Sequence, residues 1–388
     1  MIELDGAEGG GQLVRTALSL SALDGRPFRM ENVRGNRSTP GLKRQHLACV
    51  DLLAAVTDAD VSGATLGSET LTFEPKSGPD AAAGGRASGS GGSESTAPDL
   101  AVDVGTAGSV TLVADTLLPL AVRLDGPIEA ALVGGTDVKW SPPADYLRAV
   151  KLPLLRACGL DAAVDVERRG FYPAGGGELA VELRPSSLSR IDLPTRGGAT
   201  GGPTGAADDA TGLAWRARAV ASADLDDADV ADRLAESAVD DLDERGIAAD
   251  ATARASYVDA DSTGAVLTLV AAAGSGETPS DDEAPSQNPR PRAGFAALGE
   301  PGVPAEDVAA AAVDGAERWV ERTAPIDAHL GDQLVVWLAL AGGEVRIPRV
   351  TDHVRTNVEL VREFGYDVAI EPGDGPEATL VAPESRLG

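Results

Sequence analysis

Three low-complexity stretches limit how this chain can fold, because they divide its 388 residues into separate patterned segments. They cover residues 77–98, 195–212 and 274–293, and are rich in Gly with differing shares of Ser, Ala, Thr, Asp, Glu and Pro. Segments of this composition bury little apolar surface, so we expect them to be surface loops or linkers. The patterned segments between them must supply the core.

The segment between the last two stretches has a pattern of its own. Residues 214–224 alternate like a strand, residues 228–245 are amphipathic like a helix, and residues 264–272 resemble a second strand. The apolar positions of the helix are Val230, Leu234, Ala238 and Leu242. This order predicts a small α/β domain inserted into a larger one.

Helical and strand patterns also alternate on both sides of this segment, which predicts an α+β protein built from tandem units. The expected helices cover residues 12–23, 41–56, 108–121, 143–158, 304–322 and 354–364. The expected strands cover residues 27–33, 70–74, 99–104, 128–134, 161–167, 178–183, 344–348 and 366–371. Aromatic residues make up only 3% of the chain, so Ala, Val and Leu must form most of the core.

The chain has no sequence signal for a membrane or for export. No stretch approaches the roughly 18 uninterrupted apolar residues of a spanning helix, and the first residues, MIELDGAEGG, do not resemble a secretory signal. We therefore expect a soluble, cytoplasmic protein. Cys49 and Cys158 are too few for a disulfide framework and lack metal-ligand spacing, so both are expected to be buried.

The charge is strongly negative, with 61 acidic and 33 basic residues and a net charge of −28. This charge alone disfavours a nucleic-acid partner, because neutralised phosphates normally supply much of the affinity. Only four of the basic residues are lysines, and such an acidic, lysine-poor surface is typical of proteins from salt-loaded cytosols. In molar salt, charges are screened beyond about 3 Å, so that only short-range contacts matter.

Acidic residues are absent from three stretches, residues 9–23, 33–50 and 168–177. The first two contain Arg15, Arg34, Arg37, Lys43 and Arg44. Local cationic islands in so acidic a chain indicate anion sites. The alternative is that these arginines pair with carboxylates elsewhere in the sequence.

Glycine-rich turns precede several of the expected helices. The run EGGGQLVR at residues 8–15 leads into a helix, where backbone N–H groups and the helix dipole favour an anion. It is not a Walker A loop, because no GK[ST] follows. Further turns are GTAGS at 105–109, GGTD at 134–137 and PAGGG at 173–177. Each of these is also compatible with a purely structural turn.

The chain contains three histidines, at positions 46, 329 and 353. His46 lies in a basic island as a packing or RNA-contact residue, and His329 stands at the start of an apolar helix. His353 follows Thr351 and Asp352, either of which can cap the next helix. A neutral imidazole in that first turn suits a nucleophile that attacks phosphorus. The alternative is an ordinary histidine at a helix start.

Long, ordered motifs in this chain resemble the RNA 3′-terminal phosphate cyclase family. They are EGGGQLVRTALSLSALDGRPF, RGNRSTPGLKRQHL, GTAGSVTLV, GGTD, SPPADYLR, RRGFYPAGGG, HLGDQL and DHVRTN. The resemblance implies a large domain of three repeated units, each pairing two helices with a four-stranded sheet, plus a small inserted α/β domain. Residues 1–185 and 276–388 would form the large domain, and residues 186–275 the insert.

The resemblance also implies an ATP-dependent reaction on RNA 3′-phosphate ends, assisted by Mg²⁺ or Mn²⁺. A histidine would take AMP from ATP and pass it to the RNA 3′-phosphate. The adjacent 2′-hydroxyl would then close a 2′,3′-cyclic phosphate and release AMP. The position of the nucleophile matches His353. The resemblance further allows a homodimer.

Other roles follow from the same motifs. Residues expected to bind the RNA phosphate are Arg15, Arg34, Arg37 and Gln45, and Glu8 is expected to bind the metal. Residues expected to bind ATP are Asp115, His329, Leu330, Gly331 and Asp332. At position 115 relatives often carry glutamine, so that Asp115 would instead hold a cation or a ribose hydroxyl. At position 329 relatives can carry an aromatic ring, and histidine would stack on adenine less extensively.

Two other functions are compatible with parts of this pattern. A non-catalytic, cyclase-like factor for ribosome assembly would lack the nucleophilic histidine and much of the arginine set. A small-molecule phosphate transferase could be built from similar repeats, but the segment RGNRSTPGLKRQHL argues against it through the resemblance. The presence of His353, Glu8 and the arginines favours the enzyme.

Overall fold

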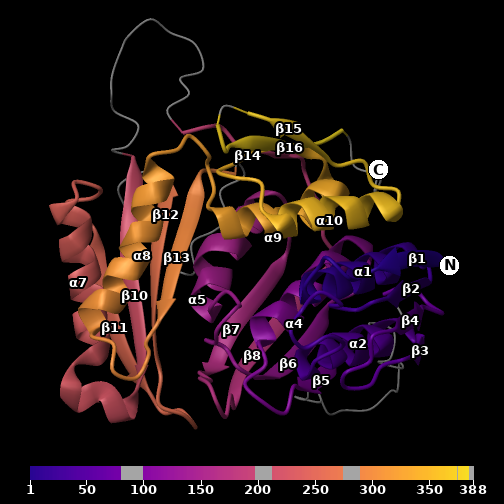
Figure 1. Cartoon of the computed structure of the whole chain (residues 1–388), viewed down its shortest axis with the longest axis horizontal. Helices are drawn as coiled ribbons and strands as arrows, with labels where there is room; N and C mark the ends of the chain where they lie inside the picture. The colour runs from indigo at the N-terminus through magenta and orange to yellow at the C-terminus, as the bar shows by residue number, and fades with distance from the viewer. Residues whose placement is uncertain (80–98, 197–211, 274–288, 374, 384–388) are drawn as a thin grey trace, which may run out of the picture.

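The computed structural model describes residues 1–79, 99–196, 212–273, 289–373 and 375–383 (Figure 1). The strands of these residues form four sheets of four strands each, with helices packed against them, which confirms a mixed α+β protein. Most of the three low-complexity stretches lies outside the described residues. Cys49 and Cys158 are buried and free, as predicted.

The first sheet has the order β1-β2-β4-β3. Its strands are β1 (Ile2–Asp5), β2 (Phe28–Glu31), β4 (Leu71–Glu74) and β3 (Asp60–Ser62), and its helices are α1 (Gly11–Asp24) and α2 (Arg44–Thr57). Alternate side chains of β2 and β4, such as Phe28 and Phe73, are fully buried and stack at 6.1 Å between ring centroids. The outward residues between them stay accessible, which is the expected period of a half-buried strand.

The second sheet has the order β5-β6-β8-β7. Its strands are β5 (Leu100–Asp103), β6 (Ile128–Gly134), β8 (Gly177–Leu183) and β7 (Ala162–Arg168). One face is covered by α4 (Val110–Leu117), η1 (Leu118–Arg123), α5 (Ala144–Tyr146), η2 (Leu147–Lys151) and α6 (Leu152–Ala157). The helix predicted at 143–158 is therefore present, but its middle turn, η2, is a π-helix. Such turns are rare and often occur at functional sites.

The third sheet has the order β15-β16-β14-β9. Its strands are β15 (Ala369–Pro372), β16 (Ala378–Ala382), β14 (Gly343–Ile347) and β9 (Ile191–Asp192), and its helices are α9 (Ala328–Ala341) and α10 (Asp352–Glu363). The first three sheets share one hydrophobic core, built mainly from Leu, Val and Ala. Helices α1, α9 and α10 pack together within it, which brings both ends of the described chain close to each other (Figure 1).

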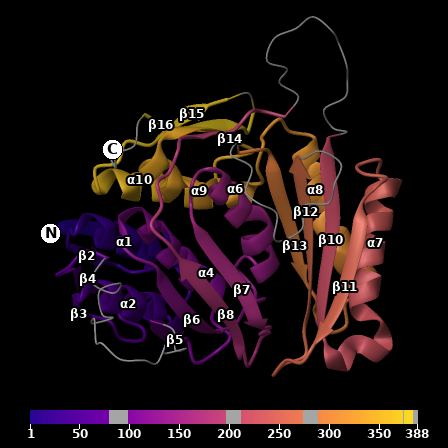
Figure 2. The same cartoon turned by 180° about the vertical axis from the view of Figure 1, so that it is seen from behind.

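The fourth sheet has the order β11-β10-β12-β13 and stands beside the other three (Figure 2). Its strands are β11 (Thr252–Val258), β10 (Leu213–Ser222), β12 (Ala265–Ala273) and β13 (Arg292–Leu298). With η3 (Ala223–Ala228), α7 (Val230–Glu244) and α8 (Ala305–Val320) it encloses a second core. Trp215, Phe295 and Trp319 meet there with ring centroids about 6 Å apart.

The predicted insert boundaries, 186 and 275, do not coincide with the borders of this sheet. Strand β9, inside the predicted range, pairs with β14 of the third sheet. Strand β13 and helix α8, beyond residue 275, belong to the fourth sheet, because β13 pairs with β12 and α8 packs on the second core. The low-complexity stretch after residue 273 suggested a border, although it separates two neighbouring strands of one sheet.

The chain leaves the three-sheet core and returns to it at one place. The backbone N–H of Arg196 donates to Thr323 O at 2.8 Å, and its Nε donates to Ala324 O at 3.1 Å. Its guanidinium also lies 3.6 Å from the centroid of the Trp319 ring, and burial lowers the pKa of Arg196 to about 10. Arg196 thus fastens the outgoing chain to the returning chain.

Among the described helices, none is both long and apolar enough to cross a membrane.

Candidate active site

The glycine run before α1 brings His353 and Arg37 to the start of that helix. Gly10 is the N-cap of α1, in an extended conformation, and the first turn of the helix contains no acidic residue. A β-carbon at Gly10 would lie 3.3 Å from Nη2 of Arg37 and 3.5 Å from Cε1 of His353. Both groups therefore lie beside the N-cap of α1, where the first backbone N–H groups of a helix have no intrahelical partner. This arrangement favours an anion.

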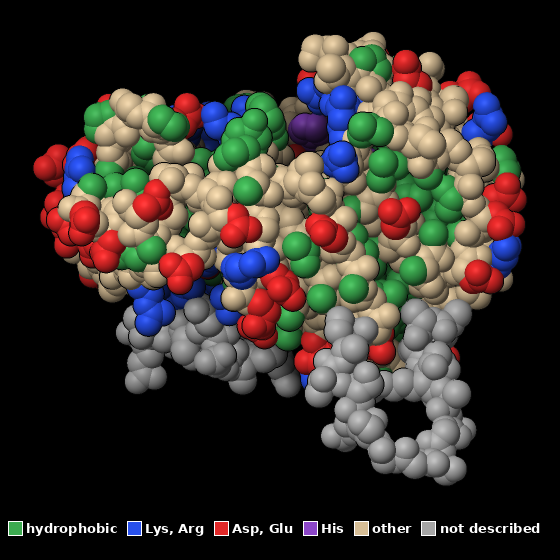
Figure 3. All heavy atoms as spheres, turned by 90° about the horizontal axis from the view of Figure 1, so that it is seen from below, with side chains coloured by type: hydrophobic (Ala, Val, Ile, Leu, Met, Phe, Trp, Pro, Cys, Tyr) green, Lys and Arg blue, Asp and Glu red, His purple; other side chains and the backbone are tan. Residues whose placement is uncertain are grey.

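His353 occupies the first turn of α10. Thr351 is the N-cap, since its Oγ1 accepts from Val354 N at 3.0 Å, which settles the choice between the two predicted caps. Partial burial lowers the pKa of His353, and the Arg37 and Arg15 guanidiniums lower it further. The imidazole is therefore neutral at neutral pH and keeps a free lone pair. Figure 3 shows a histidine beside Lys and Arg side chains at the edge of a hollow, with acidic side chains spread over the rest of that face.

His46 is a packing residue. It is 3% exposed, its Nδ1 accepts from Lys43 N at 2.9 Å, and its Nε2 lies against Gly11, where a β-carbon would come within 2.0 Å. Burial lowers the pKa of His46 to about 3, with nearby Arg15 acting in the same direction. A neutral His46 thus joins the start of α2 to the start of α1. Of the two roles predicted for it, the structure shows packing.

Arg15 and two carboxylates lie behind this surface, between α1, α4 and α9. Burial lowers the pKa of Arg15, while Asp115 and Asp332 act against that shift. Asp115 forms a very short ion pair with Nζ of Lys151, whose side chain is 1% exposed. The charge of Asp115 is thus compensated by Lys151 on the π-helix η2, a residue whose role was not predicted from the sequence. Its one available signal was that it is one of four lysines in the chain.

Asp327 fixes the start of α9, which carries four of the predicted ATP-binding residues. Its carboxylate accepts from His329 N at 2.8 Å and Leu330 N at 3.0 Å, and also from the Tyr146 hydroxyl and Gly294 N at 2.9 Å. His329 is exposed and accessible to a ligand, whereas Leu330 and Gly331 are buried. The roles of Asp327 and Tyr146 were not predicted from the sequence, because they depend on partners distant along the chain.

The carbonyl of Asp332 joins three helices. It accepts from Nε2 of Gln12 on α1 and from Nδ2 of Asn357 on α10, both at 3.4 Å. Asn357 is 1% exposed, and its Oδ1 has no hydrogen-bond partner among the described residues. A buried acceptor of this kind is available to a donor group of a bound ligand. Neither Gln12 nor Asn357 was identified from the sequence as a site residue.

The Asp332 side chain gives a prediction for pH dependence. Burial and the nearby Asp327 raise its pKa from 3.8 to about 7. Between these values the folded protein retains a proton that the unfolded chain has lost, so stability falls as pH rises across this range. We expect the Tm of Asp332→Asn minus the Tm of the wild type to increase when pH is raised from roughly 5 to 8, because the variant lacks the titrating carboxyl. Asp352→Asn, at an exposed position, should show no such gain, and a pH-independent Tm difference for Asp332→Asn would contradict the prediction.

Arg34 stabilises the loop of the cationic island at 33–50, and Gln45 connects that island to the turn at 105–109. Nη1 of Arg34 donates to Thr39 O and Gly41 O, both at 2.9 Å, and so fixes the loop that carries Arg37. Gln45 Oε1 accepts from Ser109 N at 3.4 Å, at the start of α4. Gln45 is thus close to the glycine turn at 105–109. The contact of either side chain with an RNA phosphate stays a prediction.

Glu8 lies in the exposed loop between β1 and α1, two residues before Gly10. Within the described ranges, no group of three or more His, Cys, Asp or Glu side chains is placed to hold a metal ion. A single carboxylate fits Mg²⁺ or Mn²⁺ only if phosphate oxygens and water supply the other ligands.

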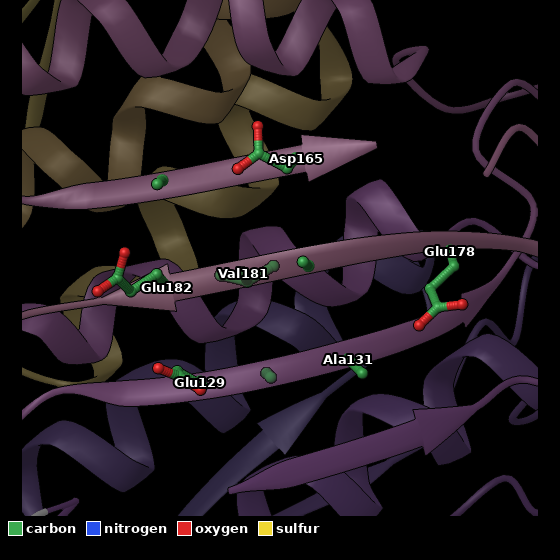
Figure 4. A pocket seen from close by; sticks show the side chains of 9 residues that line it. Glu129, Ala131, Asp165, Glu178, Val181 and Glu182 are labelled. Atoms are coloured by element: carbon green, nitrogen blue, oxygen red, sulfur yellow. The ribbon is translucent and has the colours of Figure 1, made fainter. Parts of the chain in front are cut away.

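A shallow pocket over the second sheet is a poor candidate for the site. It is lined by small side chains and by the carboxylates of Glu129, Asp165, Glu178 and Glu182 (Figure 4). Among these described lining residues there is no basic side chain, so the pocket repels phosphate.

Comparisons with known proteins give a family model and several similar proteins that share one name. A family model described as RNA 3′-terminal phosphate cyclase matches residues 6–370. A protein named RNA 3′-terminal phosphate cyclase from Halobacterium salinarum is 44% identical over 379 residues, which cover 98% of this chain and 99% of that protein. Proteins of the same name from Ectopseudomonas mendocina and Pyrococcus furiosus are 36% and 34% identical, and each alignment covers 94% of this chain and 92% or 93% of the relative.

The structure defines an α+β protein with a candidate anion site, in which arginines flank a neutral histidine at the start of a helix. The chain belongs to the RNA 3′-terminal phosphate cyclase family, which confirms the resemblance seen in its motifs.

Proposed function

We propose that this protein converts RNA 3′-terminal phosphates to 2′,3′-cyclic phosphates at the expense of ATP, through a covalent His353–AMP intermediate. One observation supports it most strongly. The neutral imidazole of His353 and the guanidinium of Arg37 both face Gly10 at the start of α1, where the backbone favours a phosphate. Membership of the family adds the substrate class.

In the first step, a ring nitrogen of His353 attacks the α-phosphorus of ATP. A P–N bond forms, the α–β P–O bond breaks, and pyrophosphate leaves. In the second step, an oxygen of the RNA 3′-phosphate attacks the same phosphorus, and the P–N bond breaks. In the third, the 2′-hydroxyl attacks the 3′-phosphorus, loses its proton and expels AMP. Each step forms one bond to phosphorus and breaks another, so no further reactant is needed.

The other predicted residues have roles consistent with their positions. Arg15, Arg34, Arg37 and Gln45 would bind phosphate groups of the two substrates, for which the guanidinium fork is well suited. The residues of the nucleotide pocket would be Asp115, His329, Leu330, Gly331 and Asp332. Oδ1 of Asn357, at the junction of α1, α9 and α10, has no hydrogen-bond partner in the described part of the chain, which supports a polar ligand at this place.

Glu8 would hold Mg²⁺ or Mn²⁺ together with phosphate oxygens. Such an ion would supply positive charge that offsets the charge of the triphosphate.

The finer organisation of the family also belongs to this proposal. The first three sheets would be the three repeated units, and the fourth sheet with α7 and α8 would be the inserted domain. A homodimer and function in molar salt stay predictions.

The test uses the full chain, an RNA oligonucleotide with a 3′-phosphate, ATP labelled at the α-phosphate, and either metal ion, at low and at molar salt. We expect an acid-labile protein–AMP adduct and an RNA end that resists phosphatase. If neither forms under any of these conditions, the non-catalytic role in ribosome assembly would be favoured instead. If the protein–AMP adduct forms but the RNA is not cyclised, the proposed transfer of AMP to the protein stands and the RNA 3′-phosphate is rejected as its substrate.

A further inference from the structure

Two aromatic side chains are exposed on loops that follow strands β6 and β7 of the second sheet. Trp140 is 96% exposed and Tyr172 is 74% exposed. The other three tryptophans, Trp215, Trp319 and Trp337, are at most 3% exposed. Single exposed apolar residues are common, but large aromatic ones are usually buried or bound to a partner. In a chain with 3% aromatic residues, two neighbouring exposed rings need an explanation.

The loops that carry the two rings are bound to each other. Asp137 and Phe171 form a parallel β-bridge, and the N–H groups of Thr136 and Asp137 both donate to Gly170 O. Trp140 follows one end of this bridge by three residues and Tyr172 follows the other end by one. The two rings therefore start from backbone positions within roughly 10 Å of the bridge.

A buried ion network fixes these loops from beneath. Arg169 donates to Asp137 at 3.1 Å and to Asp145 at 2.8 Å, and both carboxylates are nearly inaccessible. The Thr136 hydroxyl donates to Asp137 at 2.7 Å and accepts from Gly170 N at 2.9 Å. Phe171, the neighbour of Tyr172, is 2% exposed and packs against the fourth sheet. The rings thus project from a rigid base.

The backbone at Trp140 is held in a conformation that a tryptophan rarely adopts. Its φ is +63°, in the left-handed region, where a side chain is unfavourable. The flanking residues are held by Ser141 Oγ, which donates to Val138 O, and by the ion pair between Lys139 and Glu300. Since the ring makes little contact with the protein, packing does not account for this conformation.

A continuous series of contacts joins these loops to His353. Arg37 and His353 meet at Gly10, and α2 of the same basic island contacts the turn at 105–109 through Gln45. The turns at 105–109, 134–137 and 173–177 then pack backbone to backbone, because Gly134, Gly135 and Gly175 would each place a β-carbon within 3.0 Å of that first turn. A strand of RNA that follows this surface would pass Arg44, whose Nη1 lies near Gly105.

We infer that Trp140 and Tyr172 form a stacking platform for bases of single-stranded RNA upstream of the terminal phosphate. The inference rests on the proposed function and specifies how the rest of the substrate is held. Base stacking on aromatic rings needs no particular sequence and depends little on salt, unlike phosphate contacts. Such a platform suits a chain with a net charge of −28, whose surface repels a polyanion except at its cationic islands.

Tryptophan fluorescence tests the platform without ATP, because Trp140 is the exposed tryptophan of this chain. The probe is an oligoadenylate of about ten nucleotides with a 3′-phosphate. We expect RNA to quench the emission of the wild type and to protect it from acrylamide, at low salt and in molar KCl, and the quenching to be lost in Trp140→Phe. Unchanged emission at RNA concentrations that saturate binding, measured by anisotropy of labelled RNA, would overturn the inference. The inference would also be overturned if the tryptophan emission changed with protein concentration in the absence of RNA, because that would indicate self-association.

Affinity and chain-length preference provide the second test. We expect Trp140→Ala and Tyr172→Ala each to weaken binding of the long oligonucleotide about ten-fold, and to reduce the preference for it over a 3′-phosphorylated dinucleotide. The matched control is Leu66→Ala, because Leu66 is also exposed, at 62%, and lies outside both loops. Equal losses on short and long RNA would reject the platform. Failure of the proposed function would instead appear as an absence of the protein–AMP adduct, which this binding assay does not require.

Discussion

Replacement of His353 by alanine is expected to abolish the transfer of AMP from ATP to the protein, with a loss of roughly three orders of magnitude or more in rate. The imidazole is the nucleophile in the proposed first step, and its lowered pKa keeps it neutral and reactive. The measurement is adduct formation with α-labelled ATP, followed by cyclisation of the RNA end.

A matched variant separates the nucleophile from its surroundings. His329→Ala removes the other exposed histidine of the site and should weaken ATP binding while leaving a measurable adduct. The lowered pKa of His353 also predicts that adduct formation by the wild type stays near its maximum at pH values below 6.5, the ordinary value for histidine. Labelling that persists in His353→Ala would assign the nucleophile to another residue.

Replacement of Lys151 by leucine is expected to cost about 3–5 kcal/mol of unfolding free energy. The variant leaves the Asp115 carboxylate without its ion-pair partner in an interior already occupied by Asp327 and Asp332. The double variant Asp115→Asn, Lys151→Leu should recover most of the loss, because it removes both charges together. Thermal and denaturant unfolding of the wild type, the two single variants and the double variant gives the coupling energy.

The control for this cycle is an exposed pair in the same protein. Lys76 pairs with Asp60 on the surface, where both side chains are at least half exposed, so Lys76→Leu should change stability little. If Lys151→Leu and Lys76→Leu lose similar amounts of unfolding free energy, Lys151 does not compensate a buried charge on Asp115. The double variant also tests Asp115 for ATP affinity without the confounding effect of an unstable fold.

Sequence periodicity predicted most of the elements around the site, because their signals are local. The strand at 128–134 has the predicted limits, and the helix predicted at 354–364 is α10 with its cap at Thr351. The strands β3 and β9, of three and two residues, carry no periodicity and were missed. The strands β1, β11, β13 and β16 were not predicted either. The predicted insert range, 186–275, followed composition, whereas the strand pairing of the fourth sheet runs from β10 to β13.

The site was predicted unevenly for a physical reason. His353, Arg15 and Arg37 lie in motifs with a recognisable chemistry, and the structure brings them together. Lys151 pairs with Asp115 across 36 positions, and nothing in either local sequence specifies that contact. The exposure of Trp140 depends on a backbone conformation that composition and periodicity do not encode. Contacts between distant segments, and their consequences for charge, therefore required the structure.

The contact of Arg196 with Thr323 has a consequence for the order of folding. The core contains segments from both sides of the fourth sheet, and bringing them together through a long unfolded chain has an entropic cost that grows with its length. If the fourth sheet and α8 form first, they present Trp319 and Thr323 to Arg196, and this contact brings the outgoing and returning ends of the core chain together. Early formation of the fourth sheet would thus lower the effective contact order of the remaining protein and speed the assembly of its core.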